Sequence, residues 1–143
     1  MGSKPPAPRV MVFGVFDRLH PGHLYFLSRA EAKGKVIAVV ARDRSVRRIK
    51  NKSPQDKERR RLMRVRGTGL VFRAVLGDME EGSYEVVRRF MPERIVLGYD
   101  QKALRRDLER KMRKKELPRI RLFILEAYEP AKFHTSLLPA GVP

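Results

Sequence analysis

Short apolar segments alternate with segments of helical periodicity along almost the whole chain. The apolar segments of strand length are residues 10–16, 36–41, 70–76, 94–97 and 120–125. The segments of helical spacing are residues 22–33, 54–65, 83–90 and 102–116, the second of them with Ser53 as cap and Pro54 at its first position. Strands that are apolar on both faces and alternate with helices form parallel sheets covered on both sides. The sequence therefore predicts an α/β fold: a single, doubly wound, Rossmann-like domain with a five-stranded parallel sheet.

The length and composition are typical of one domain without disulfides. With 143 residues, of which 42% are hydrophobic, the chain is long enough for one buried core. Residues 1–8 include three prolines, which predicts a flexible leader before a domain that spans residues 9–143. No apolar run approaches the ~18 to 20 residues of a membrane span, and the first residues lack the apolar core of a secretory signal, so we expect a cytoplasmic protein. Cysteine is absent, which excludes disulfides, thiolate nucleophiles and zinc bound by cysteine.

The chain is strongly basic, with a formal net charge of +17 from 33 Lys and Arg against 16 Asp and Glu. Residues 42–66 contain twelve basic and three acidic side chains, and residues 102–121 contain ten and three. Such a field attracts triphosphates, RNA and acidic lipids alike, so the charge does not choose among these partners. A charged fraction of 34%, rich in arginine, is also typical of thermophilic proteins, which is an alternative explanation of the composition.

Three polar segments follow directly after predicted strands. They are residues 17–23, 42–52 and 98–101. In doubly wound sheets, ligands bind at the carboxyl ends of the strands, where the strand order reverses. We therefore expect these segments to meet at one edge of the sheet and to form one site.

The first of these segments contains the pattern His-Pro-Gly-His at the junction of a strand and a helix. His20 and His23 stand three residues apart, and Gly22 leaves room for a phosphate to approach the helix N-terminus. Two imidazoles beside such a cradle donate hydrogen bonds to a phosphoryl group as its charge grows in the transition state. Two other interpretations stay open: His20 as a helix cap with His23 as buried filler, and a zinc site, for which no third ligand has a matching spacing.

The pattern Gly-Val-Phe-Asp at residues 14–17, followed by His-Pro-Gly-His, resembles the signature of the cytidylyltransferase-like nucleotidyltransferase superfamily, G-T-F-D and then H-x-G-H. The likeness extends from residue 10 to about residue 136. Within the superfamily, residues 41–54 (ARDRSVRRIKNKSP), 75–78 (VLGD) and 97–101 (LGYDQ) are similar to the archaeal FAD synthases, which are single-domain FMN adenylyltransferases. The resemblance implies a transferase that joins AMP from ATP to FMN and releases pyrophosphate, with Mg²⁺ bound to the triphosphate, and a homodimer.

The resemblance also implies roles for individual residues. As catalytic residues, His20 and His23 would hold and stabilise the transferred α-phosphate, with Lys50 contacting phosphate. The nucleotide would lie against Gly14, Val15, Phe16, Asp17, Gly22, Gly98, Tyr99, Asp100, Gln101, Thr135 and Ser136. Phosphates of the triphosphate or the acceptor would contact Arg42, Lys52 and Lys132.

Several residues keep a second interpretation. Tyr99 either stacks on a base or only covers the sheet edge, and the basic side chains of residues 42–52 either bind phosphate or form a solvated face. Asp43 either touches a ligand or pairs with a neighbouring arginine. Residues 59–61 lie inside a predicted helix and cannot all face one ligand at 3.6 residues per turn, so we expect most of them to face solvent.

The sequence departs from the family signature in two places. Val15 stands where the signature has threonine, which removes a hydroxyl near the phosphates and leaves the backbone N–H. Near the C-terminus, residues 132–143 read KFHTSLLPAGVP, and Pro139 and Gly141 would stop the helix that family members form there. A nucleotide-binding regulator without catalysis is the alternative that these departures suggest.

Other substrates and another class of protein are also alternatives. CTP with glycerol 3-phosphate or another alcohol phosphate is the second substrate pair, and ATP with 4′-phosphopantetheine is the third. An RNA-binding module would interleave aromatic rings with its basic residues, and residues 42–66 contain no aromatic ring. We therefore expect no specific nucleic-acid partner and no membrane, and an in-line displacement at the α-phosphorus that needs positioning and positive charge.

Overall fold

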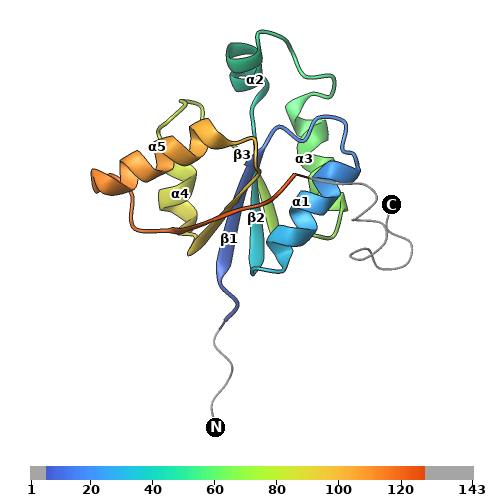
Figure 1. Cartoon of the computed structure of the whole chain (residues 1–143). Coiled ribbons are helices and arrows are strands. Elements are labelled where there is room, and N and C mark those ends of the chain that lie inside the picture. Colours follow the sequence, from blue (N-terminus) through green and yellow to red (C-terminus); the bar gives the residue numbers. More distant parts are fainter. Residues whose placement is uncertain (1–5, 128–143) are drawn as a thin grey trace.

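A five-stranded parallel sheet in the order β3-β2-β1-β4-β5 forms the centre of the molecule (Figure 1). The computed structural model describes residues 6–127 of the chain. The strands are β1 (Arg9–Gly14), β2 (Lys35–Val40), β3 (Arg73–Leu76), β4 (Arg94–Leu97) and β5 (Arg121–Ile124). The helices are α1 (Pro21–Glu31), α2 (Asp43–Lys50), α3 (Glu58–Gly67), α4 (Glu85–Phe90) and α5 (Lys102–Arg113). The predicted doubly wound fold with five parallel strands is confirmed.

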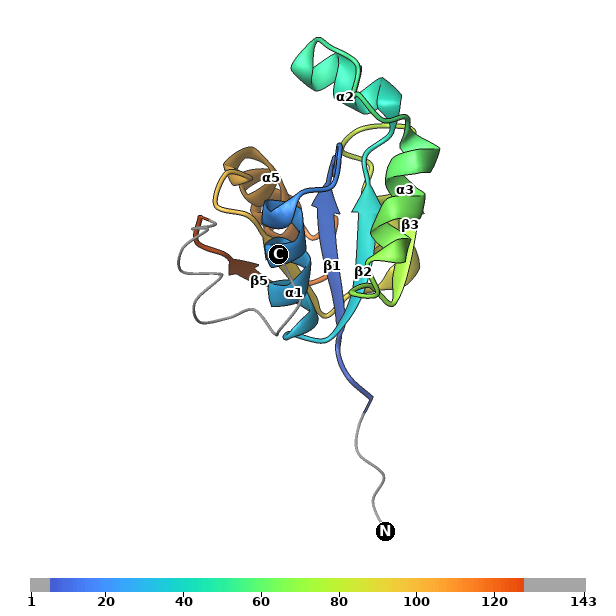
Figure 2. The ribbon, with the colours of Figure 1, turned by 90° about the vertical axis from the view of Figure 1, so that its right-hand side faces the viewer.

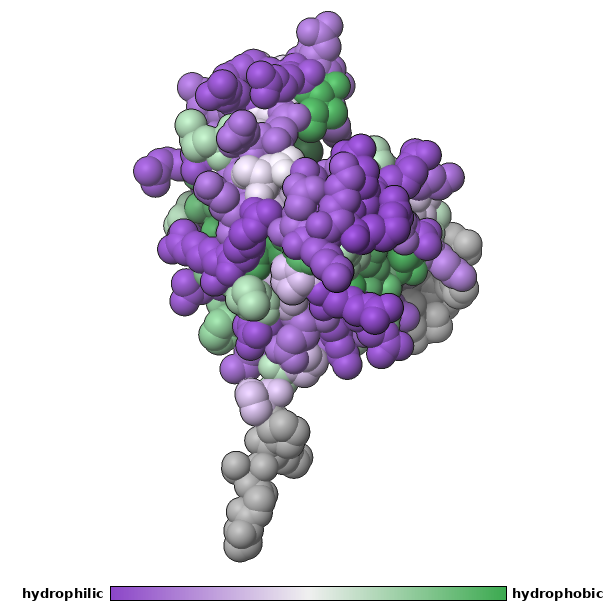
Figure 3. Space-filling model, turned by 90° about the vertical axis from the view of Figure 1, so that its left-hand side faces the viewer, coloured by the Kyte–Doolittle hydropathy of each residue, from purple (hydrophilic) through white to green (hydrophobic). Residues whose placement is uncertain are grey.

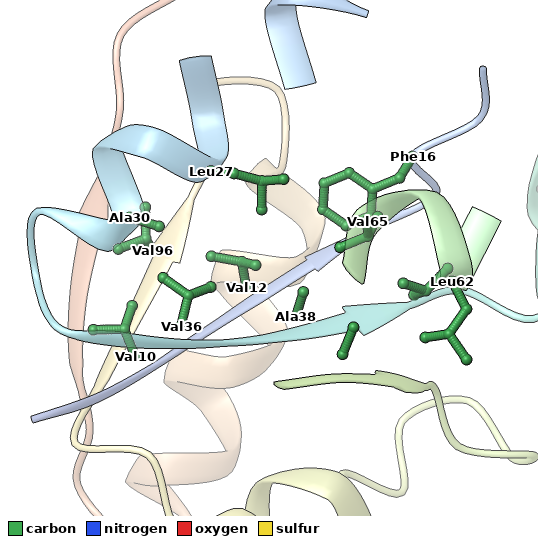
Figure 4. Packing of buried hydrophobic residues seen from close by; sticks show 12 residues of the cluster. Val10, Val12, Phe16, Leu27, Ala30, Val36, Ala38, Leu62, Val65 and Val96 are labelled. Atoms are coloured by element: carbon green, nitrogen blue, oxygen red, sulfur yellow. The ribbon is translucent and has the colours of Figure 1, made fainter. Parts of the chain in front are cut away.

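Two helical layers cover the sheet, with α1 and α3 on one face and α4 and α5 on the other (Figures 1 and 2). Because side chains alternate along a strand, β1 contributes to both layers of the core. Val10 and Val12 pack with Leu27 and Val65 in the cluster under α1 and α3 (Figure 4), and Met11 belongs to the cluster under α4 and α5. Hydrophilic side chains cover most of the outer surface on the α5 side (Figure 3).

The strand order reverses beside β1. The chain runs outward from β1 to β2 and β3, then crosses to β4 on the other side of β1 and continues to β5. At such a switch point the connections leave in opposite directions and open a crevice at the carboxyl ends of the strands. Helix α2 lies beyond that end of the sheet (Figures 1 and 2), so this crevice is where the fold offers a binding site.

The segment between β2 and β3 differs from the prediction. Residues 43–50 form α2, which was not predicted, and the helix predicted to begin at Pro54 with Ser53 as cap begins at Glu58 instead. The backbone N–H of Asp43 donates to Oε1 of Glu58 over 2.8 Å, and the N–H of Glu58 donates to Oδ2 of Asp43 over 3.2 Å. Each carboxylate thus satisfies the unpaired N–H at the start of the other helix. This long-range pair, and not a local cap at Ser53, sets where the two helices start.

The remaining bounds agree with the prediction to within a few residues. The third strand begins at Arg73 rather than residue 70, and the last helix ends at Arg113 rather than residue 116. The boundary between a leader of residues 1–8 and a domain of residues 9–143 stays a prediction. Within residues 6–127, no helix is long and apolar enough to cross a bilayer.

Tyr84 joins the two helices on the α4 and α5 face of the sheet. Its hydroxyl donates a hydrogen bond to Oδ2 of Asp107 in α5 over 2.5 Å, and its side chain is 7% exposed at the start of α4. Burial, and then the bond to Asp107 and the negative charge of that carboxylate, raise the pKa of Tyr84 far above its usual value. The hydroxyl therefore stays protonated and acts as a donor.

We expect Tyr84→Phe to lower the free energy of unfolding by about 1.5 kcal/mol, because the variant loses a hydrogen bond to a charged acceptor. Urea unfolding followed by circular dichroism measures the change. Tyr99→Phe is the matched control, since Tyr99 is largely exposed, and its effect should stay within about 0.5 kcal/mol. Equal effects of the two substitutions would show that the Tyr84–Asp107 bond does not hold α4 to α5.

Candidate active site

β1 passes into α1 through a tightly folded loop. Phe16 and Arg18 have left-handed backbone, with φ of 53° and 48°, which is costly for residues that have a side chain. The Phe16 ring packs in the core and is 3% exposed. A Cβ at Gly14 would lie 2.8 Å from this ring, closer than atoms can approach, so the loop requires glycine at this position.

The two histidines form a capping box at the start of α1. Nδ1 of His20 accepts a hydrogen bond from the backbone N–H of Gly22 over 3.1 Å, and Nδ1 of His23 accepts one from the N–H of His20 over 3.2 Å. In a neutral imidazole, one nitrogen accepts and the other donates. Because both Nδ1 atoms accept, both Nε2 atoms carry the proton. The rings are stacked, with centroids 3.7 Å apart and planes at 23°, so two N–H donors stand side by side.

His23 is held in its neutral form. Burial, followed by the electrostatic effects of His20 and Lys50, lowers the pKa of His23 to about 4, and Asp17 opposes the shift only in part. The Phe16 ring meets the His23 ring edge to face, with centroids 5.5 Å apart, and supplies part of this apolar environment. His23 therefore donates a hydrogen bond without titrating near neutral pH.

Two cavities meet at the histidine pair. The larger one has a volume of 740 Å³ and extends across the carboxyl ends of β1 and β4 towards α2. The smaller one has a volume of 330 Å³ and extends towards the turn between α2 and α3. The residues that line both cavities are Val15, His20, His23, Val46 and Lys50. A molecule in either cavity would therefore contact the two imidazoles and the ammonium group of Lys50.

The turn between β4 and α5 forms the far wall of the larger cavity. The backbone N–H of Gly98 donates to Oε1 of Gln101 over 2.9 Å, and Nε2 of Gln101 donates to the carbonyl of Phe13 over 2.8 Å. These bonds tie the turn to the end of β1. Tyr99, which is 54% exposed, and Asp100 line the cavity beside them.

The smaller cavity is closed by a loop that Asp17 fixes in place. The carboxylate of Asp17 accepts hydrogen bonds from the backbone N–H groups of Gln55 and Asp56, each over 2.8 Å. Burial alone would raise the pKa of Asp17, but these two bonds and the charges of Arg61 and Arg18 outweigh it and lower the pKa. Asp17 lines the smaller cavity, so the structure assigns it to the loop beside that cavity and not to the larger one.

Arg61 connects the loops that surround the site, and its side chain is 0% exposed. Its guanidinium donates to the carbonyls of Val15, Ala41 and Asp56 over 2.7 to 2.9 Å. It also pairs with Oδ1 of Asp43 over 2.7 Å. The loops after β1 and β2 and the turn before α3 are thus held by one side chain.

The sequence did not predict this role of Arg61, because we expected most of residues 59–61 to face solvent. That expectation is correct for Arg59 and Arg60, which are exposed. Arg61 stands one helical turn before Val65, a fully buried residue, and this spacing was the available signal. The pairing of Asp43 with an arginine was one of its two open interpretations, and the arginine is Arg61.

The other predicted site residues divide into three groups. Lys50 and Lys52 line the smaller cavity. Arg42 lines neither cavity: its Nε donates to the carbonyl of Gly77 over 2.7 Å and its guanidinium lies 3.9 Å from Glu58. Lys132, Thr135 and Ser136 lie outside the described residues. Within residues 6–127, no group of three or more His, Asp and Glu side chains is arranged to hold a metal ion.

The wall of the larger cavity also contains residues of α2 that the sequence did not indicate. Ser45 and Ile49 face the cavity from this helix. No sequence signal identified them, because residues 42–52 were not predicted to be helical and the many charges there suggested only phosphate contacts.

We expect Arg61→Lys to lower the free energy of unfolding by about 3 kcal/mol, because a lysine ammonium cannot reach all four acceptors and leaves buried carbonyls and Asp43 unpaired. Thermal and urea unfolding measure this loss. The matched control is Arg60→Lys on the exposed side of the same helix, for which a change below about 0.5 kcal/mol is expected. A similar stability of both variants would contradict the anchoring role.

The neutral state of His23 predicts a pH-dependent stability. In the unfolded chain, His23 titrates near pH 6.5, whereas in the folded protein it stays neutral until about pH 4. The contribution of neutral His23 is therefore complete above pH 6.5 and is lost as the pH falls from 6.5 towards 4. Urea unfolding at pH 7.5, 6 and 4.5 should show the wild type losing stability relative to His23→Asn. Parallel curves for the two proteins would contradict the lowered pKa.

Comparison with known proteins identifies relatives of this chain. The cytidylyltransferase-like family matches residues 11–138. The chain is 42% identical over 121 residues to the FAD synthase of Aciduliprofundum boonei, covering 84% of this chain and 79% of that protein. It is 40% identical over 111 residues to the FAD synthase of Methanosarcina barkeri, covering 77% and 78% of the two chains.

Solved structures share the fold. A crystal structure described as a lipopolysaccharide core biosynthesis protein from Thermoplasma volcanium superposes with a TM-score of 0.77 at 35% identity, covering 86% of this chain and 99% of the other. The pantoate–β-alanine ligase of Francisella tularensis has a TM-score of 0.64 at 9% identity, covering 86% and 60% of the chains, and shows the fold alone. The chain therefore belongs to the cytidylyltransferase-like family, and its similar relatives within that family include archaeal FAD synthases.

Proposed function

We propose that this protein is an FMN adenylyltransferase, which transfers AMP from ATP to FMN, forms FAD and releases pyrophosphate. One observation carries the proposal: two stacked imidazoles, both with Nε2 as donor, stand where two cavities meet. A transferase that joins two phosphorylated substrates needs donors at the point where the two substrates touch. The relatives named FAD synthase support the choice of FMN and ATP.

In this proposal the nucleoside of ATP occupies the larger cavity. Tyr99 offers an exposed ring for stacking on the adenine, beside Gly98, where a side chain would crowd Asp100. The α-phosphate lies at the histidine pair beside the N-terminus of α1, where the positive end of the helix dipole favours an anion. Lys50 and Lys52 contact phosphate oxygens from the smaller cavity.

The reaction is an in-line displacement. A phosphate oxygen of FMN attacks the α-phosphorus of ATP, a new P–O bond forms, and the bond to the leaving pyrophosphate breaks. The attacking phosphate is ionised at neutral pH, since its second pKa is about 6, so no general base is required. The Nε2–H groups of His20 and His23 donate to the oxygens on which charge grows. The neutral state of His23 suits this role, because the N–H of a neutral imidazole donates a hydrogen bond without passing its proton to the phosphate.

The divalent metal enters this proposal as part of the substrate. The described residues contain no group of three carboxylate or imidazole side chains that would hold an ion independently. Mg²⁺ binds triphosphates and retains several of its own waters, so it arrives with ATP. The cationic residues at the site would then balance the charge that the metal leaves uncompensated.

The alternatives from the sequence receive no specific support. The family relatives described above are named FAD synthase, and no observation favours CTP with an alcohol phosphate, 4′-phosphopantetheine or a regulator without catalysis. The homodimer and the cytoplasmic location stay predictions. Arg42 stays a predicted phosphate contact only if its side chain leaves Gly77 when substrate binds.

We expect His20→Asn and His20→Ala each to lower the turnover of FMN with ATP by about 10² to 10³-fold, because both remove the Nε2–H donor. Chromatography of FAD and release of pyrophosphate measure the loss. The two substitutions differ in their effect on the fold. Asparagine keeps an oxygen that caps the N–H of Gly22, so only the alanine variant should lose about 1 kcal/mol of stability.

This pair of variants separates a catalytic role from a structural one. Near-full activity of His20→Asn would refute the role of the imidazole ring as a donor, because this variant keeps the helix cap and loses only the Nε2–H group. Turnover of CTP with glycerol 3-phosphate, together with none of ATP with FMN, would overturn the proposed substrates while leaving the transferase chemistry intact.

A further inference from the structure

Every strand of the sheet begins with a basic residue. The first residues of the strands are Arg9, Lys35, Arg73, Arg94 and Arg121. Because the strands are parallel, these residues stand at one edge of the sheet, opposite the edge beside α2 (Figure 2). Since side chains alternate along a strand, Arg9, Lys35 and Arg73 start on the face covered by α4 and α5, and Arg94 and Arg121 start on the face covered by α1 and α3. With neighbouring strands about 4.8 Å apart, four steps give a row about 19 Å long. We call these five residues the amino-edge row.

Three phenylalanine rings contact cations of the amino-edge row. The pairs are Lys35 with Phe72 at 4.8 Å, Arg73 with Phe90 at 5.7 Å and Arg121 with Phe123 at 4.8 Å, measured from the charged group to the ring centroid. All cation–π contacts between residues 6 and 127 involve one of these three rings. The combination of cations and aromatic rings that residues 42–66 lack is therefore present at the other edge of the sheet.

Two members of the row have a structural partner. Arg9 donates to the carbonyls of Phe90 and Met91 at the end of α4, and Arg94 donates to the carbonyl of Lys33 beyond the end of α1. Such bonds satisfy the last carbonyls of helices.

The other three members, Lys35, Arg73 and Arg121, have no such internal partner. Within the part of the chain that the structure describes, they form no ion pair with a carboxylate. Among residues 6–127, the one carboxylate that pairs with the row is Glu93, and its partner is Arg9. Lys35, Arg73 and Arg121 are therefore available to an external anion.

A cavity of 640 Å³ opens beside the row. Its lining residues include Phe72, three cations and one carboxylate, namely Lys33, Lys35, Arg94 and Glu31. Phe72 is 64% exposed, which leaves much of its ring open to a planar partner. A flat lipid surface would leave the cavity unfilled. An acidic peptide would pair with the cations but would make no use of the exposed Phe72 ring. A base joined to phosphates matches both features, because the ring stacks on the base and the cations contact the phosphates.

We propose that the amino-edge row and Phe72 form a docking surface for single-stranded nucleic acid, bound without sequence preference. A row about 19 Å long exceeds what one nucleotide needs and suits several consecutive phosphates. The surface lies at the edge opposite the histidine pair, so this binding is independent of the transferase reaction. It also agrees with the expectation that the protein has no specific nucleic-acid partner, since stacking and phosphate contacts do not read sequence.

The test uses the whole protein and a fluorescently labelled single-stranded RNA of twelve nucleotides, with anisotropy measured at several salt concentrations. The row variant combines Lys35→Gln, Arg73→Gln and Arg121→Gln, and leaves Arg9 and Arg94 on their helix carbonyls. We expect the slope of log affinity against log salt to fall by about 2, since each phosphate contact on a single strand contributes about 0.7. The matched control combines Arg59→Gln, Arg60→Gln and Arg106→Gln, which removes the same charge from exposed positions elsewhere.

Phe72→Ala tests the stacking separately. It should weaken binding about tenfold with an unchanged salt slope, because it removes a ring and no charge. Thermal unfolding and the transferase reaction should be the same in all variants and in the wild type, which separates this proposal from the proposed function.

Three results would overturn the proposal. One is an equal loss of RNA affinity in the row variant and its control, which would show that only the net charge matters. Another is an unchanged affinity in Phe72→Ala. The third is binding to phosphatidylserine vesicles that depends on the row while RNA binding does not, which would assign the surface to a membrane.

Discussion

The buried guanidinium of Arg61 is the interaction on which the site depends. It meets three carbonyls and the carboxylate of Asp43, and these acceptors belong to three separate connections of the chain. Burying a charge is costly unless hydrogen bonds and a counter-charge replace the lost water, and this arrangement supplies both. The loops that border both cavities therefore share one anchor, and a change at that anchor moves all of them together.

Local geometry then orients the two histidines. The capping box sets the two histidine rings by bonds within four residues, and Phe16 supports His23 from the core. Because backbone N–H groups donate to both Nδ1 atoms, the fold decides that Nε2 is the nitrogen that faces a ligand as donor. The structural interpretation of His20 as a helix cap and the functional one as a phosphate donor are thus compatible, since the cap uses Nδ1 and leaves Nε2 free for a ligand. A capping role also explains why the rings are positioned before any substrate binds.

The two edges of the sheet have different chemistry. At the carboxyl edge, two stacked imidazoles and Lys50 stand between two cavities. At the amino edge, cations contact phenylalanine rings, and part of this charge satisfies carbonyls at the ends of helices. The basic residues that give the net charge of +17 therefore have different roles at different places in the fold. Arg94 satisfies a carbonyl beyond the end of α1 and Arg61 anchors three loops, so the position of each basic residue in the fold decides what its charge does.

The sequence by itself determined the strand pattern, the helix at residues 21–31 and the pair His20 and His23, because each of these depends on neighbours within one or two turns of the chain. It did not determine that Arg61 is buried while Arg60 is exposed, that Arg42 turns to Gly77, or that residues 43–50 form a helix. Those outcomes depend on partners 15 to 46 positions away, such as Glu58 for Asp43 and Val15 for Arg61. A run of basic residues looks alike along its length, and only the tertiary structure decides which of them meets a carbonyl, a carboxylate or water.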